Sequence, residues 1–211
     1  MTDIYILYGA PATGKGTVTQ QLPPEHCIGM GRLLRAQNMG KDGNLVSDDY
    51  VNSLIKDELS KHTGYVVLDG YPRTPPQVDF LLALPGISIR RVYELTCPDK
   101  ELMNRLTLRQ SCSCGASYHP ILKPAHEEGI CDKCHQKLFR RPDDKPEIVQ
   151  KRLDQYHELT APILKKFGDL VQQVDVSKDF TSAVKLISQS ILSEQSGAAV
   201  SRRFQNGYEH E

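Results

Sequence analysis

The stretch LYGAPATGKGTVTQQL, residues 7–22, decides the fold that this sequence predicts. β-prone residues precede it, and its polar, helix-compatible second half ends before Pro23 and Pro24. Between the predicted strand and helix lies the pattern G-x-x-x-x-G-K, which ends at Lys15. In such a turn, successive backbone N–H groups and the helix N-terminus point at an anion, and the lysine adds a positive charge. The stretch therefore predicts a site for the phosphates of a nucleotide.

Composition limits the possible classes of protein. The 211 residues suit one domain of ordinary size, and 26 basic residues balance 26 acidic ones. This balance argues against binding to nucleic acid or to an anionic membrane. The sequence has neither an apolar run near the ~20 residues of a membrane span nor the basic start of a signal peptide. We therefore expect a cytoplasmic protein whose six cysteines stay reduced, which favours metal binding over disulfides.

Strand-like and helix-like segments alternate along the chain. This alternation predicts an α/β fold, a parallel sheet with helices on both faces. The expected strands are residues 4–8, 26–28, 65–68, 92–96 and 170–174, and the expected helices are 15–22, 47–61, 75–83, 98–110, 144–167 and 180–192.

A second motif, GYVVLDGYPR at residues 64–73, is an apolar strand that ends in an acid and a tight turn. Asp69 would lie at the carboxyl end of this strand, where ligands of open α/β sheets bind, and could hold a water of a Mg²⁺ shell. Arg73 offers a planar guanidinium to a phosphate. The alternative interpretation is a capping aspartate beside a surface arginine.

Several arginines follow on predicted helices. Arg105 and Arg109 lie four residues apart on one helix face, where they repel each other unless an anion or acid lies between them. Asp144 and Glu147 form a plausible capping box for a helix that carries Arg152. Taken alone, these arginines fit a solvated helix surface as well as a phosphate site.

The sequence resembles the nucleoside monophosphate kinases, and specifically the adenylate kinases, because it contains two of their motifs in the same chain order, G-x-P-x-x-G-K-G-T and LDGYPRT. The resemblance covers residues 1–192 and implies a P-loop NTPase-type fold with a five-stranded parallel sheet. It implies the Mg²⁺-dependent reaction ATP + AMP ⇌ 2 ADP, with nucleotides as the only partners and a monomeric enzyme. The implied parts are a core (1–28, 62–110, 143–192), a monophosphate-binding flap (29–61), a lid (111–142) and a disordered tail (193–211).

The resemblance also implies the roles of individual residues. The catalytic residues would be Lys15, Arg73, Arg109, Arg141 and Arg152, with Asp69 holding Mg²⁺ through water. The ATP-binding residues would be Ala12, Thr13, Gly14, Lys15, Gly16, Thr17, Arg105, Arg109, Ser117, Tyr118 and Lys178. The AMP-binding residues would be Met30, Arg35, Asn44, Leu45, Val46, Gly70, Tyr71, Pro72, Arg73, Gln77, Arg141 and Arg152.

Three departures from the family pattern bear on function. Ala12 replaces a glycine, which costs about 1 kcal/mol if that position needs a positive φ. Met30 replaces the hydroxyl residue that touches the acceptor base, and Arg32 replaces an acid. The flap after Arg35 also lacks most of a helix. Although Gln77 still favours adenine, these changes predict looser acceptor selectivity and a higher acceptor KM, so a UMP/CMP-type or broad-specificity kinase stays an alternative.

A cysteine-rich segment, residues 111–142, interrupts the alternation. Its two cysteine pairs suit tetrahedral Zn²⁺, and a flap of roughly 30 residues is too small to stay folded by hydrophobic burial alone. The predicted ligands are Cys112, Cys114, Cys131 and Cys134, and His135 or His119 could replace a cysteine. Open alternatives are reduced cysteines without metal, haem attachment at C-D-K-C-H, and a non-catalytic nucleotide-binding module with a zinc flap. We expect Cys27 and Cys97 to be small core residues.

Overall fold

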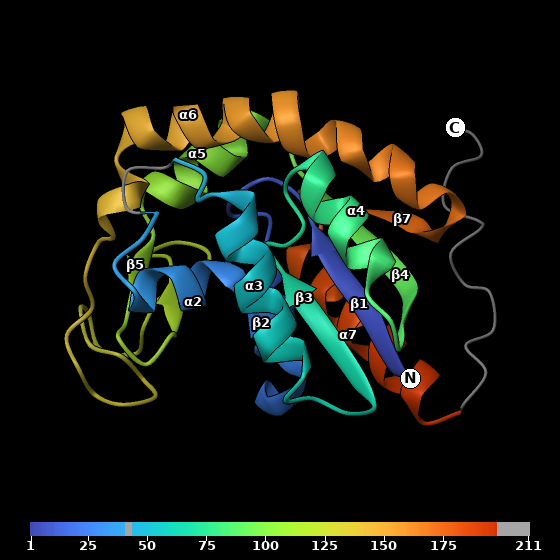
Figure 1. The fold of residues 1–211 in the computed structure, drawn as a ribbon. Helices are drawn as coiled ribbons and strands as arrows, with labels where there is room; N and C mark the ends of the chain where they lie inside the picture. Colours follow the sequence, from blue (N-terminus) through green and yellow to red (C-terminus); the bar gives the residue numbers. More distant parts are fainter. Residues whose placement is uncertain (41–43, 198–211) are drawn as a thin grey trace, which may run out of the picture.

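The computed structural model describes residues 1–40 and 44–197. Its main sheet has five parallel strands in the order β2-β3-β1-β4-β7 (Figure 1). This confirms the predicted fold class, a P-loop-type α/β sheet with a cysteine-rich insertion. The strands are β1 (Thr2–Tyr8), β2 (Cys27–Gly29), β3 (Tyr65–Asp69), β4 (Ile87–Thr96) and β7 (Val171–Asp175).

Helices cover both faces of this sheet, which is why its central strands are continuous apolar runs. One face packs on α2, α3, α4 and the 3₁₀ helix Ala161–Leu170, and the other packs on α1 and α7. A third cluster joins α5 to α6. The α-helices are α1 (Lys15–Thr19), α2 (Met30–Ala36), α3 (Asp48–Leu59), α4 (Pro75–Ala83), α5 (Asp99–Thr107), α6 (Pro146–Gln155) and α7 (Phe180–Gln195).

The sequence analysis did not predict helix α2. Glycines at positions 29 and 31 obscure its pattern, because glycine is a poor helix former. Met30 is nevertheless buried in the core, so tertiary packing compensates for the weak propensity. The helix carries Arg32 and Arg35 to the carboxyl edge of the sheet.

The last third of the chain differs in detail from the prediction. The helix expected over 144–167 divides into α6, a π-helical turn (Tyr156–Thr160) and the 3₁₀ helix, because Pro162 has no N–H to continue the ladder. Helix α7 runs to Gln195, so residues 193–195, which were predicted to belong to the disordered tail, are helical. Glu194 explains this, since its carboxylate accepts bonds from Tyr5 Oη (2.9 Å) and Arg91 Nε (3.3 Å). Residues 198–211 of the predicted tail lie outside the described residues.

The cysteine-rich lid contains a small hairpin of β5 (Gln110–Ser111) and β6 (Ser117–Tyr118), where no strand was predicted. Two-residue strands are too short to give a sequence pattern. A separate small core of Cys112, Ala116, Tyr118 and Cys131 fills the lid. Within residues 1–40 and 44–197, none of the helices combines the length and apolar character that crossing a bilayer requires.

Candidate active site

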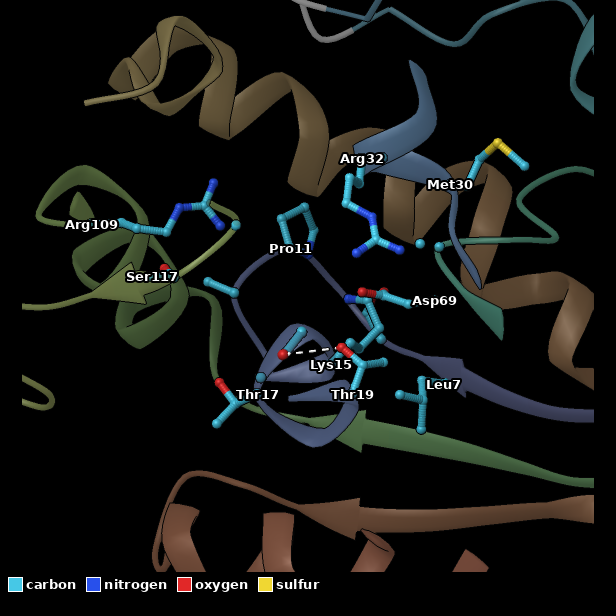
Figure 2. Close-up of a pocket in the computed structure, with 18 of the residues that line it drawn as sticks. Leu7, Pro11, Lys15, Thr17, Thr19, Met30, Arg32, Asp69, Arg109 and Ser117 are labelled. Atoms are coloured by element: carbon cyan, nitrogen blue, oxygen red, sulfur yellow. Dashed lines mark hydrogen bonds between the residues drawn. The ribbon is translucent and has the colours of Figure 1, made fainter. Parts of the chain in front are cut away.

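A cavity of about 920 Å³ opens at the carboxyl edge of the sheet. The turn after β1, the flap helix α2, the end of β3, the lid and α6 all contribute to its lining. Figure 2 shows Lys15, Arg32, Asp69 and Arg109 around this space, although they come from α1, α2, the end of β3 and the segment between α5 and β5. Every segment for which the sequence predicted a nucleotide-binding residue contributes to this lining.

The turn between β1 and α1 depends on two glycines. Gly9 has φ +138°, and a Cβ at that position would lie 2.5 Å from the carbonyl oxygen of Leu95. Gly14 has φ +101°, and a Cβ there would lie 2.4 Å from the ring of Phe180. Both positions therefore need glycine for conformation and for space. This keeps the backbone N–H groups of the turn and of the start of α1 at the cavity.

Lys15 lies folded back on its own loop. Its ammonium donates to the carbonyl oxygens of Gly9 and Ala10, both at 2.8 Å. Burial lowers the pKa of this ammonium to about 8, although the Asp69 carboxylate opposes the shift. An arriving phosphate would replace the neutral carbonyls and favour the charged form.

Ala12 shows the strain that the sequence predicted, with φ +66°. The left-handed region is unfavourable for a residue with a Cβ. Replacing Ala12 with Gly is therefore expected to raise the free energy of unfolding by about 1 kcal/mol. Urea denaturation of the variant and the wild type measures this difference, and an unchanged or lower midpoint would contradict it.

Asp69 and Arg73 flank the same edge of the sheet. In the parallel register Leu7 pairs with Asp69, so the end of β3 lies beside the glycine-rich turn. The distance from an added Cβ on Gly16 to Asp69 Oδ2 would be 4.0 Å, which places this carboxylate beside the first turn of α1. Arg73 Nε donates to the carbonyl oxygen of Gly70 at 2.9 Å, and burial lowers the pKa of its guanidinium.

Two buried aspartates hold the arginines on the far side of the cavity. Arg109 makes a two-pronged contact with Asp144, including Nε to Oδ2 at 2.9 Å. Arg152 Nη1 donates to the carbonyl oxygen and the carboxylate of Asp143, at 3.0 and 3.1 Å. The predicted capping box is wrong, because α6 begins at Pro146 without a side-chain cap and Asp144 binds arginines instead. Burial lowers the pKa of Arg152 to about 10.

Arg105 and Arg109 bind different partners. Its Nη2 pairs with Glu101 and donates to the carbonyl oxygen of Val176 at 3.0 Å. Its guanidinium carbon lies 5.2 Å from the ring centre of Phe180. Its Nε and Nη1 are buried and have no hydrogen-bond partner among the described residues. Sequence analysis missed Phe180, since the first residue of an amphipathic helix gives no sign of such a contact.

The remaining predicted residues also reach the cavity. Arg141 Nε donates to Ser111 Oγ at 2.8 Å, and burial lowers the pKa of its guanidinium to about 10. Except for Thr13, every residue predicted to bind ATP, AMP or Mg²⁺ lines the cavity. The Thr13 side chain is buried and donates to the carbonyl oxygen of Ala10 at 2.9 Å, and its role in binding ATP stays a prediction. Lys123 and Lys133 of the lid also line the cavity and were not predicted.

The four lid cysteines form one cluster. All four sulfur atoms lie within 4.8 Å of one another, with Sγ separations of 3.3 Å for Cys112–Cys134 and 3.6 Å for Cys114–Cys131. A tetrahedral Zn²⁺ with Zn–S bonds near 2.3 Å would place its ligands about 3.8 Å apart, so the cluster could hold this ion. The structure favours the four cysteines over the histidine alternative, because the cluster includes neither His119 nor His135, and His119 Nδ1 accepts two backbone N–H groups at 3.1 Å.

The fold and the site define a class of protein, the phosphate-binding-loop phosphotransferases. Comparison with known proteins gives the family. The model described as "Adenylate kinase" matches residues 7–171. An adenylate kinase from Methanococcoides burtonii is 36% identical over 207 residues, covering 88% of this chain and 95% of the relative. One from Erythrobacter litoralis is 39% identical over 196 residues, covering 81% and 91%. The chain therefore belongs to the adenylate kinase family, enzymes that transfer a phosphoryl group between adenine nucleotides.

Proposed function

We propose that the enzyme transfers the γ-phosphoryl group of ATP to AMP, reversibly and with Mg²⁺, to give two ADP. One observation carries the proposal: positive side chains from separate elements line a single cavity beside a glycine-rich phosphate loop. AMP would bind under the flap helix α2, and ATP would bind between the loop and the lid. The positive side chains are Lys15, Arg35, Arg73, Arg105, Arg109, Arg141 and Arg152.

The mechanism that these residues support is positioning and charge neutralisation. Phosphoryl transfer needs little covalent help, so no general base is required. Lys15 would leave its loop carbonyls for the phosphates of ATP. Arg109 and Arg152, which Asp143 and Asp144 hold at the cavity, would contact the migrating group. Because the aspartates already fix these guanidinium groups, little rearrangement is needed when the nucleotides bind.

Asp69 and Thr17 fit the Mg²⁺ that this chemistry uses. Both line the cavity next to the start of α1, and Mg²⁺ prefers oxygen ligands of this kind. Mg²⁺ bound with ATP would neutralise charge on the phosphates. Asp69 would hold the ion through water, and Thr17 would offer a hydroxyl.

In this proposal the flap and the lid move relative to the core. The lid and the flap would close over the nucleotides and exclude water, which otherwise competes for the phosphoryl group. Zn²⁺ at the four lid cysteines would keep the lid folded. The two cysteines of C-D-K-C-H belong to this cluster, which favours zinc over haem attachment. We propose that the protein acts as a cytoplasmic monomer.

A second candidate is a kinase with broader acceptor use. Met30 is buried and lines the cavity where the family places a residue with a hydroxyl group. Its thioether is a weak hydrogen-bond acceptor and cannot donate a hydrogen bond. The short flap leaves fewer groups to contact the base. A higher acceptor KM and some activity with other monophosphates are therefore part of the proposal.

A coupled assay for ADP formation tests the proposal. We expect turnover with ATP and AMP that requires Mg²⁺, and the highest kcat/KM with AMP among AMP, CMP, GMP and UMP. No ADP from any of these acceptors would contradict kinase activity and support a non-catalytic nucleotide-binding module. A preference for UMP and CMP would support the UMP/CMP-type alternative.

A further inference from the structure

Arg32 is a basic residue on the cavity to which the proposed mechanism gives no role. It lies in the first turn of α2 and is exposed. Its Nη2 makes one long hydrogen bond, to the carbonyl oxygen of Cys27 at 3.4 Å, and it forms no ion pair with any described residue. The family pattern has an acid at this position, so the positive charge is a feature of this chain. The guanidinium therefore keeps most of its hydrogen-bonding capacity for a ligand.

The strand register places Arg32 close to Asp69. Gly29, the last residue of β2, pairs with Asp69 at the end of β3, and α2 begins at the following residue. Figure 2 shows the Arg32 side chain extending from α2 toward Asp69 and Lys15. Burial raises the pKa of the Cys27 thiol to about 11, and Arg32 opposes this shift while Asp69 adds to it, so both charges act near Cys27. Arg32 thus lies between the flap helix α2 and the phosphate loop.

The charges at this point of the cavity leave room for an anion. Among the described residues that line the cavity, the acidic ones are Asp69, Glu101 and Asp143. Glu101 and Asp143 already pair with arginines of the opposite wall. The positive charges of Arg32 and Lys15 therefore face the single carboxylate of Asp69. An anion bound between them would balance this excess of positive charge.

We propose that Arg32 is a further phosphate-binding residue, which contacts the phosphates between the two nucleosides when these phosphates carry no metal ion. The inference rests on the proposed function, since ATP on the loop and AMP under α2 put the transferred phosphoryl group between Lys15 and Arg32. A guanidinium can donate two N–H groups to one phosphate in a charge-assisted contact. After the transfer the acceptor is ADP, and its new phosphate lies in the same space. The ligand class is therefore a nucleotide whose phosphates are not neutralised by metal.

Arg32 and Mg²⁺ would compete for the same role. Both supply positive charge to the phosphates near Asp69, and a guanidinium is repelled by a dication. Arg32 should therefore contribute most to affinity when metal is absent, and little when Mg²⁺ neutralises the phosphates. A purely structural role for Arg32 would change both affinities alike. The ratio of the Kd without metal to the Kd with Mg²⁺ separates these two roles.

The test measures by calorimetry the binding of diadenosine pentaphosphate, a dinucleotide whose phosphate bridge would span both sides of the cavity, in Mg²⁺ and in EDTA. Arg32→Gln should raise the Kd in EDTA about tenfold, because one charge-assisted contact is lost. The same variant should change the Kd in Mg²⁺ by less than about threefold. Arg32→Glu should raise the Kd in EDTA about 100-fold or more, because a negative charge then faces the phosphates.

Arg90→Gln is the matched control, because Arg90 is exposed on β4 and does not line the cavity. It should keep both wild-type Kd values. An unchanged Kd in EDTA for Arg32→Gln, or an equal rise in both conditions, would overturn the inference. Failure of the proposed function looks different, since the wild type would then form no ADP from ATP and AMP. ADP formation together with Kd values that do not depend on Arg32 would leave the proposed function standing and reject only the role of Arg32.

Discussion

Lys15→Met is expected to lower kcat by about 1,000-fold or more. The ammonium of Lys15 lies at the glycine-rich loop, where it donates to the carbonyl oxygens of Gly9 and Ala10 and to Thr13 Oγ1. In the proposed mechanism it moves to the ATP phosphates and stabilises charge during transfer. Methionine has a similar length and no charge, so this stabilisation is lost while the packing of the loop is kept.

The fold should survive the same substitution. Burial disfavours the charged form of Lys15, and its ammonium bonds neutral oxygens of its own loop, so a neutral side chain there breaks no close ion pair among the described residues. We expect the thermal unfolding midpoint to stay within a few degrees of wild type. Lys56→Met is the matched control, because Lys56 is exposed on α3 and does not line the cavity. It should keep wild-type turnover in the coupled assay, and near wild-type turnover of Lys15→Met would reject the assigned role of the loop.

The sequence predicted the sheet and the phosphate loop because both depend on local patterns. Helix α4 occurs over the predicted residues 75–83, where Thr74 caps it and prolines begin it. The strand that ends at Asp69 was equally clear, since apolar residues buried on both faces form a continuous run. Such features need no knowledge of distant partners.

The features that sequence analysis missed depend on distant partners. Asp144 seemed to be a helix cap, but it binds Arg109, which is 35 residues away. Phe180 packs against Gly14 and Arg105, and no spacing rule connects these positions. Helix α2 has poor propensity and is stabilised by the burial of Met30. Tertiary contacts therefore determine the structure at positions where the local sequence pattern is weak or ambiguous.

Removal of zinc is expected to unfold the lid and abolish most of the activity. Protein purified without added zinc should contain about one Zn²⁺ per chain. The lid's own core consists of a few residues, two of them zinc-ligand candidates, so little apolar burial remains without the metal. A strong chelator should lower the thermal midpoint and make residues 111–142 sensitive to proteolysis. Because Ser117, Tyr118 and Lys123 of the lid line the cavity, turnover should fall in parallel.

Cys114→Ser separates loss of the metal from loss of packing. Cys114 is exposed, so a serine there removes one thiolate ligand without leaving a cavity in the core. We expect this variant to lose most of its zinc and to behave like the chelated wild type. Cys97→Ser is the control, because Cys97 lies outside the lid and the cluster, and it should keep its zinc. Less than ~0.2 Zn²⁺ per wild-type chain, with a thermal midpoint that chelator does not change, would reject the zinc lid, because a structural metal contributes to folding free energy.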